Sequence, residues 1–199
     1  MTDYKFTQDW FSHNIPVWEQ LKSLLPERQR FLEVGSFEGR SMVWMAENMI
    51  SGEAPADIYC IDTWKGSEEH KNGELSGAED RFDYNTNIVE EENKVYVHKL
   101  KGRSIQHLAH WLVEAFEDHP TFDFIYIDGS HVAKDVLTDA CMAWPLLKQG
   151  GLLVFDDYLW GESRDILHRP RFAVDVFTNI FVESLDIVHI GHQFVVRKK

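Results

Sequence analysis

The feature of this sequence that most constrains its fold is a repeated alternation of strand-like and helix-like segments. Segments with strand character lie at residues 31–34, 57–62, 94–99, 122–128 and 152–155. Between them, segments whose apolar residues have helical spacing lie at residues 41–49, 79–87, 105–116 and 134–147. Because parallel strands need crossover connections of this length, the pattern predicts an α/β fold, a doubly wound parallel sheet with helices on both faces.

Both ends of the chain extend this pattern. Residues 7–25 have apolar positions at helical spacing, interrupted at Pro16, and predict one or two helices. The C-terminal part predicts a helix and two strands, at residues 173–183, 185–190 and 193–196. Gly191 and His192 join these strands as a two-residue hairpin connection, which adds an antiparallel strand to the sheet.

The composition of the 199 residues is that of a folded protein with a full core. Hydrophobic residues make up 44% of the chain and aromatic residues 13%, which excludes a disordered chain, a collagen and a coiled coil. No repeat, linker or low-complexity tract divides the sequence. We therefore expect a single domain over residues 1–199, with a helical segment at residues 1–28 and a core at residues 30–199.

The charge balance limits the partners that the chain can bind. The sequence has 20 basic and 33 acidic residues, a formal net charge of −13, so we expect neither nucleic acid nor an anionic membrane as a partner. Cys60 and Cys141 lie in apolar contexts and predict reduced core cysteines rather than a disulfide framework. With no signal peptide and no apolar span, we expect a soluble, cytoplasmic protein. Association into a homo-oligomer stays open.

Polar residues gather where the predicted strands end, which is where open α/β sheets bind ligands. Residues 33–41 follow the first strand and contain Gly35 and Gly39, which allow a tight turn before a helix whose N-terminus offers free N–H groups. Asp62 ends the second strand, 23 residues beyond Gly39, a position that suits an acceptor for a ribose diol. Each signal alone also fits an ordinary turn or helix cap, but together they favour an adenosine-containing ligand.

Three carboxylates follow the fourth and fifth strands: Asp128, Asp156 and Asp157. If these strands are neighbours, two such charges about 4 Å apart repel by about 4 kcal/mol at an effective dielectric of 20, so a cation is expected between them. Oxygen ligands favour Mg²⁺, Mn²⁺ or Ca²⁺ over zinc, with Mg²⁺ the first expectation. The alternative is that these residues only cap the following helices.

A histidine follows the first of these carboxylates by three residues. His131 could reach the same site, and an imidazole that titrates near neutrality can take a proton from an alcohol or a phenol. His70 and His168 are weaker candidates, as residues of loops that cover the site.

From about Arg30 to Lys199 the chain resembles the class I S-adenosylmethionine-dependent methyltransferases. It is most similar to the metal-dependent small-molecule O-methyltransferases of macrolide and aminocoumarin sugars and, more distantly, to catechol O-methyltransferase. The resemblance is carried by the order and spacing of residues 31–35 with Gly39 and Ser41, then of residues 61–64, 102–104, 122–131 and 146–158, and by the C-terminal hairpin.

This resemblance implies a Rossmann-like fold, a seven-stranded sheet of order 3-2-1-4-5-7-6, and roles for individual residues. Gly35, Ser36 and Gly39 would line the methionine part of S-adenosylmethionine, with Ser41 near its carboxylate. Asp62 would hold the ribose, flanked by Trp64, and Ser104 would lie near the adenine; Glu33 and Asp128 are also counted as cofactor-binding. Asp128, Asp156 and Asp157 match the family's metal ligands, and His131, with Asp128, its catalytic residues. Some relatives place an acidic base at the position of Ser130, and the serine here favours His131.

The function implied is methyl transfer to a hydroxyl of a small molecule such as a sugar, a polyol or a phenol, with loops 65–76 and 160–170 covering the site. Two alternatives stay open. An NAD(P)-dependent oxidoreductase would share Gly35, Gly39 and Asp62, but it would have no use for adjacent aspartates after the fifth strand. A non-catalytic module that binds S-adenosylmethionine would keep the first half of the sheet and need no acidic cluster.

Overall fold

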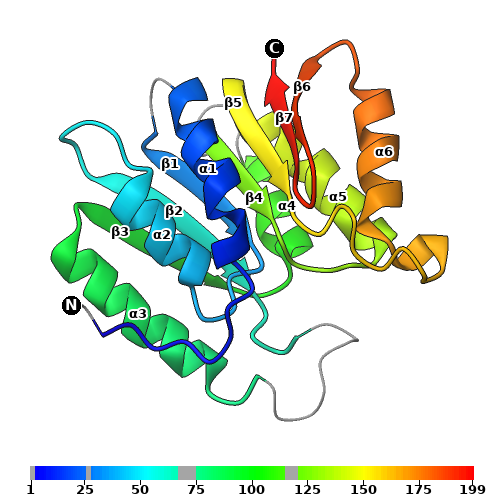
Figure 1. Cartoon of the computed structure of the whole chain (residues 1–199). Helices are drawn as coiled ribbons and strands as arrows, with labels where there is room; N and C mark the ends of the chain where they lie inside the picture. The colour runs from blue at the N-terminus through cyan, green and yellow to red at the C-terminus, as the bar shows by residue number, and fades with distance from the viewer. Residues whose placement is uncertain (1–2, 26–27, 67–74, 115–120) are drawn as a thin grey trace.

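The computed structural model describes residues 3–25, 28–66, 75–114 and 121–199. Within these residues seven strands form one sheet of order β3-β2-β1-β4-β5-β7-β6, as the resemblance predicted (Figure 1). The strands are β1 (Arg30–Val34), β2 (Ala56–Asp62), β3 (Val95–Lys101), β4 (Phe122–Ile127), β5 (Leu147–Phe155), β6 (Leu185–Ile190) and β7 (Phe194–Lys198). Strands β1 to β5 pair in parallel, and β7 is antiparallel to both of its neighbours.

Helices cover both faces of the sheet (Figure 1). They are α1 (Ile15–Leu21), α2 (Arg40–Asn48), α3 (Ala78–Glu92), α4 (Ser104–Glu114), α5 (Ala133–Ala143) and α6 (Pro170–Ile180), with short 3₁₀ turns η1 (Ser12–Asn14), η2 (Lys22–Leu24), η3 (Trp144–Leu146) and η4 (Ile166–His168). None of the helices in the described ranges has the length and apolarity that crossing a bilayer requires.

Alternate residues of the strands face the two helical layers. In β4, which is fully buried, Phe124 and Tyr126 belong to the core shared with α1, α2 and α3, whereas Ile125 and Ile127 belong to the core shared with α4, α5 and α6. This alternation follows from the two-residue period of a strand and explains why the run could be recognised from its apolar residues alone.

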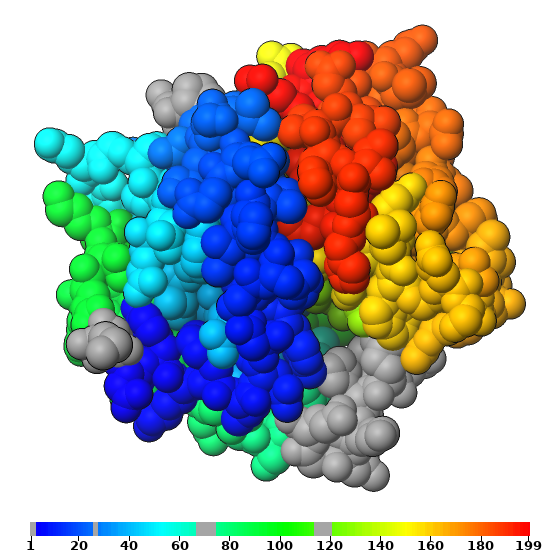
Figure 2. All heavy atoms as spheres, viewed as in Figure 1, coloured from blue at the N-terminus to red at the C-terminus, as the bar shows by residue number. Residues whose placement is uncertain are grey.

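The N-terminal segment runs across one face of the sheet, next to the β6–β7 hairpin (Figure 2). Pro16 lies in the first turn of α1, where its missing N–H is tolerated, so a single α-helix flanked by 3₁₀ turns forms over this region. Trp18 is fully buried and packs edge-on against Phe124 and Tyr126, with ring centroids 5.0 and 4.9 Å apart. These contacts anchor the segment to the centre of the sheet.

The helix that precedes β5 is shorter than predicted. It ends at Ala143 rather than Leu147, because Pro145 cannot continue a helix. Strand β5 then begins at Leu147, and Gly150 and its neighbour lie inside the strand, not before it. The pairing with β4 shifts register there, and Gly150 takes a φ of 78°, so the glycines form a bulge.

The hairpin connection is also longer than predicted, because β7 begins at Phe194 and three residues, 191–193, join the two strands. Gln193 is withdrawn from the strand to bury its side chain, whose Oε1 accepts a hydrogen bond of 2.9 Å from Trp18 Nε1. The hairpin is thereby fixed against the N-terminal segment.

Candidate active site

A cleft of about 1080 Å³ opens at the carboxyl ends of β1, β2, β4 and β5. Ten of the predicted site residues line it: Gly35, Ser36, Ser41, Asp62, Trp64, Ser104, Asp128, His131, Asp156 and Asp157. The other two, Glu33 and Gly39, are not among the lining residues. The topology explains the convergence, since β4 lies between β1 and β5 and the loops after these strands share one edge of the sheet.

Gly35 is required by the close approach of two of these loops. Its φ is 91°, and a Cβ added there would lie 2.0 Å from the carbonyl oxygen of Asp128. Gly39 has a φ of 79° and precedes α2, so the turn after β1 begins and ends on glycines of positive φ, with Phe37 (φ 47°) between them. The loop after β1 can therefore lie directly against the loop that carries the acidic residues.

Asp62 joins the loops after β1 and β2. Its Oδ2 accepts backbone hydrogen bonds from Ser36 (2.9 Å) and Phe37 (2.8 Å), and its Oδ1 accepts one from Trp64 (2.7 Å). The indole Nε1 of Trp64 in turn donates to the carbonyl oxygen of Phe37 at 2.8 Å. The predicted ribose acceptor thus also organises the backbone of the cleft, a role that the spacing alone did not indicate.

Glu33 lies beneath the cleft and is fully buried. The Ser41 hydroxyl donates to its Oε1, and Cys60 Sγ lies 3.6 Å from its Oε2. Burial raises the pKa of Glu33 to about 7, against an ordinary value of 4.5. Glu33 is therefore linked to the cleft by its hydrogen bond with Ser41, which lines the cleft.

Ser104 begins α4 at the far side of the cleft. Its hydroxyl donates to Asp139 Oδ1 at 2.6 Å, and burial raises the pKa of Asp139 to about 6. Both residues line the cleft, so the predicted adenine end carries a hydroxyl and a carboxyl that share a hydrogen bond.

The acidic cluster, Asp128, Asp156 and Asp157, is connected through a tyrosine. The Tyr126 hydroxyl lies 3.0 Å from Asp128 Oδ2 and 2.5 Å from Asp156 Oδ2. Burial and the charges of the two neighbouring aspartates raise the pKa of Asp128 well above its usual range. Burial also works to raise the pKa of Asp156, but hydrogen bonds from His192 and Tyr126 outweigh it and lower that pKa.

His131 contacts the cluster from the loop after β4. Its Nε2 lies 2.6 Å from Asp157 Oδ2, and its ring packs on Trp160 with centroids 4.0 Å apart. The guanidinium of Arg164 lies over the Trp160 ring, 4.2 Å from its centroid. The predicted base thus sits between a carboxylate and an aromatic wall of the cleft.

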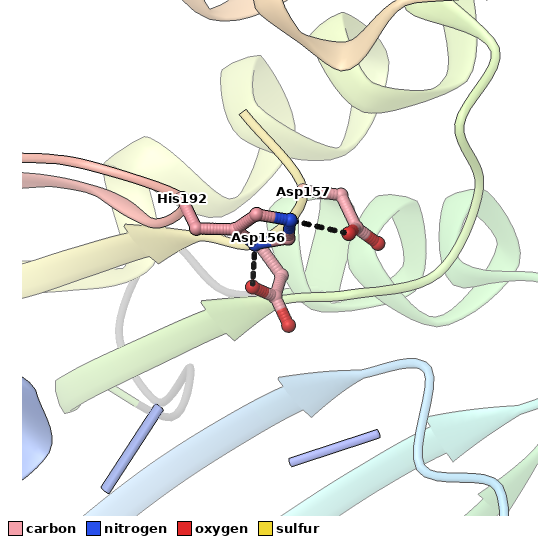
Figure 3. A group of neighbouring side chains, drawn as sticks. All are labelled: Asp156, Asp157 and His192. Carbon is pink, nitrogen blue, oxygen red and sulfur yellow. Dashed lines mark ion pairs between the residues drawn. The ribbon is translucent and has the colours of Figure 1, made fainter. Parts of the chain in front are cut away.

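Sequence reasoning missed three side chains that contact the cluster. Asn14 donates its Nδ2 to Asp156 Oδ2 at 3.1 Å, and His192 approaches both Asp156 and Asp157 (Figure 3). Tyr126 could have been found, because it lies two residues before Asp128 and the strand period puts both on one side. Asn14 and His192 are far away in the sequence and carry no local signal.

The donor set of the cluster fits a divalent cation. Within the described ranges no lysine or arginine forms an ion pair with any of the three aspartates. In the same ranges, donor atoms of Asp156, Asp157 and His192 lie within 4.8 Å of one another, whereas Asp128 is joined to them through Tyr126. Oxygen and imidazole donors in this number are typical ligands of divalent metals.

Of the two loops predicted to cover the site, loop 160–170 is described throughout. Trp160, Arg164 and His168 line the cleft, as expected for loop 160–170. Residues 67–74 of the other loop, His70 included, lie outside the described residues. All three non-glycine residues with positive φ in the described chain, Phe37, Trp64 and Asp157, also line the cleft, so backbone strain is concentrated there.

Comparison with known proteins places these features in context. The sequence profile of the methyltransferase domain family matches residues 32–158. The chain is 27% identical over 135 residues to the uncharacterized protein R132 of Acanthamoeba polyphaga mimivirus, a match that covers 64% of this chain and 51%, about half, of the viral protein.

Solved structures share the fold at low sequence identity. An O-methyltransferase from Bacillus cereus in complex with S-adenosylhomocysteine is 16% identical with a TM-score of 0.65, over 98% of this chain and 84% of that one. The calicheamicin methyltransferase CalS11 is 14% identical with a TM-score of 0.65, over 94% and 80%. The methyltransferase MycE, in complex with Mg, S-adenosylhomocysteine and mycinamycin VI, is 17% identical with a TM-score of 0.61, over 96% and 50%.

Proposed function

Since the chain belongs to the methyltransferase domain family, we propose that it transfers the methyl group of S-adenosylmethionine to a hydroxyl oxygen of a small molecule such as a sugar, a polyol or a phenol. The observation that carries this proposal is the position of His131, 2.6 Å from Asp157 at the wall of the cleft, next to two more carboxylates. A basic nitrogen beside a set of oxygen ligands is what activation of a hydroxyl needs.

The loops after β1 and β2 would bind the cofactor, which supplies an electrophilic methyl group on a sulfonium. Ser41 and the free N–H groups at the start of α2 face the cleft and suit the carboxylate of its methionine part. Asp62 and Trp64 suit the ribose, since the Asp62 carboxylate lines the cleft beside the indole. The backbone hydrogen bonds to Asp62 hold these groups in place before the ligand arrives.

Asp128, Asp156 and Asp157 would hold a divalent cation, which when bound lowers the pKa of the acceptor hydroxyl. Tyr126 and Asn14 donate hydrogen bonds that orient Asp156, and they do so without adding a positive charge. Asp156 therefore keeps the negative charge that a cation requires, while its position is fixed by neutral donors.

His131 would take the proton of the acceptor hydroxyl on its imidazole ring. Its Nε2 lies 2.6 Å from Asp157 Oδ2, and a carboxylate at this distance would stabilise the imidazolium that forms. Trp160 packs on the ring and limits its rotation. Holding the oxygen and the methyl group at near-attack distance can supply roughly 7–11 kcal/mol of the barrier, and a positioned base about 10²–10⁴-fold in rate.

Family membership sets the oxidoreductase alternative aside, and the non-catalytic module remains to be tested. The test is transfer of labelled methyl from S-adenosylmethionine to a panel of sugars, polyols and phenols, with and without EDTA. We expect transfer to a hydroxyl acceptor that stops with EDTA and returns with excess Mg²⁺ or Mn²⁺. Transfer that survives chelation would remove the cation from the proposal. Binding of the cofactor with no transfer to any acceptor would favour the non-catalytic module.

A further inference from the structure

His192 is brought to the acidic cluster by the pairing of the sheet. Strands β5 and β7 are antiparallel with Phe155 opposite Phe194, so the connection before β7 lies beside the end of β5. The backbone N–H of Tyr158 donates to the carbonyl oxygen of His192 at 2.8 Å, which ties the connection to the loop after β5. The backbone that carries the imidazole is therefore held beside the end of β5.

The imidazole lies over both adjacent aspartates. Nδ1 is 3.9 Å from Asp156 Oδ1 and Nε2 is 3.8 Å from Asp157 Oδ1 (Figure 3). One donor atom from each of the three residues lies within 4.8 Å of the others. Neighbouring ligands of one cation at bond lengths of roughly 2.1 Å are about 3.0–3.4 Å apart, so a shift of less than about 2 Å would bring the three donors onto one ion.

The surroundings of these three residues favour a cation over a simple histidine–aspartate pair. Asp156 already accepts hydrogen bonds from Asn14 and Tyr126, both neutral, and Asp157 faces His131 on its other oxygen. The half-exposed imidazole faces both carboxylates, at 3.9 Å from Asp156 Oδ1 and 3.8 Å from Asp157 Oδ1. Two carboxylate oxygens and a ring nitrogen that face one another are the donors that a divalent cation would take.

We propose that His192 is a nitrogen ligand of the cation bound by Asp156 and Asp157. This rests on the proposed function and adds the class of the metal to it. Mg²⁺ prefers an octahedron of oxygens, whereas imidazole raises affinity for first-row ions in the order Mn²⁺, Fe²⁺, Co²⁺, Ni²⁺. The site is therefore selective for a first-row transition metal over Mg²⁺.

The same geometry keeps the nitrogen ligand out of the way of an acceptor. Asp156 and Asp157 line the cleft, but His192 is not among the lining residues. The imidazole binds from the side of the hairpin, and the side that faces the cleft is left to the acceptor oxygen and to His131. The two histidines thus have separate tasks, one toward the metal and one toward the proton.

The test is calorimetric titration of the metal-free chain with CoCl₂ and with MgCl₂, with the visible absorption of Co²⁺ recorded in parallel. We expect the wild type to bind Co²⁺ at least about 100-fold more tightly than Mg²⁺. His192→Ala should weaken Co²⁺ binding at least tenfold and change the visible spectrum, while Mg²⁺ affinity changes less than threefold. His189→Ala, in the neighbouring strand of the same hairpin, is the matched control and should bind both ions as the wild type does.

Three results would overturn the inference: no Co²⁺ binding by the wild type, unchanged Co²⁺ binding by His192→Ala, or an equal loss for both ions. His192→Gln, which keeps a polar side chain, is measured beside the alanine variant, and the melting temperature of each verifies folding. The affinity of the metal-free proteins for S-adenosylhomocysteine is recorded in the same series. It tests the cofactor site independently, since a failure there contradicts the proposed function and leaves the His192 result standing.

Discussion

Glu33→Gln should stabilise the protein in a manner that depends on pH. Glu33 is fully buried, and its pKa is raised from 4.5 to about 7, so at pH 8 the native state has to hold a carboxylate without a cationic partner among the described residues. At about 1.4 kcal/mol per pH unit, this shift corresponds to roughly 3 kcal/mol.

The sign follows from proton binding. The native state binds a proton at Glu33 between pH 4.5 and about 7 and the unfolded state does not, so the contribution of Glu33 to stability is complete below pH 4.5 and is lost as pH rises to about 7. Glutamine mimics the protonated form at every pH. The difference in unfolding free energy between the variant and the wild type should therefore rise by about 3 kcal/mol from pH 4.5 to pH 8.

Urea denaturation of both proteins at pH 5, 6, 7 and 8 measures this difference, and the titration of all other groups cancels. With a slope of about 2–3 kcal/mol/M, the midpoints should separate by about 1 M at pH 8. Glu53→Gln, at an exposed carboxyl, is the matched control and should show no such trend. A difference that stays constant with pH would refute the reasoning, because it would mean that the buried carboxylate is stabilised by groups we have not identified.

Other substitutions test the loops and the cluster. Gly35→Ala should abolish binding of S-adenosylhomocysteine in calorimetry, because the new Cβ would lie 2.0 Å from a backbone oxygen. The control Gly52→Ala should bind normally, because Gly52 has a similar φ of 84° but only a side chain near its Cβ position. Equal binding by the two variants would contradict the argument from the close approach of the loops. Asp62→Ala should weaken that binding by on the order of 1.5–3 kcal/mol, and unchanged affinity would remove Asp62 from the cofactor site. Tyr126→Phe should lower cation affinity by about 10–100-fold, measured by titration of the metal-free protein, because Asp156 loses an orienting donor; an unchanged affinity would show that this hydroxyl is dispensable.

The sheet and most of the cleft could be predicted from the sequence because their signals are local. The apolar run of β4 and the polar residues that follow β1, β2, β4 and β5 are properties of short segments. The bulge in β5 could not be predicted, since Gly150 and its neighbour read as the end of a helix unless the partner strand is known.

The connections across the chain could not be predicted for a different reason. Asn14 and His192 reach the acidic cluster only through the packing of the N-terminal segment and the hairpin, and neither lies near the cluster in sequence. Asp62 was predicted as a ligand residue, but its hydrogen bonds to the backbone after β1 depend on how two loops meet. Such contacts are set by tertiary packing and cannot be inferred from a local sequence pattern.

The measurement that tests the account most directly is the turnover rate of His131→Ala with a productive acceptor and saturating S-adenosylmethionine. If His131 takes the acceptor proton, kcat should fall by about 10²–10⁴-fold, with the affinity for S-adenosylhomocysteine unchanged and with His189→Ala at the wild-type rate. A kcat close to that of the wild type would contradict the account, because the contact between His131 and Asp157 would then have no part in proton transfer.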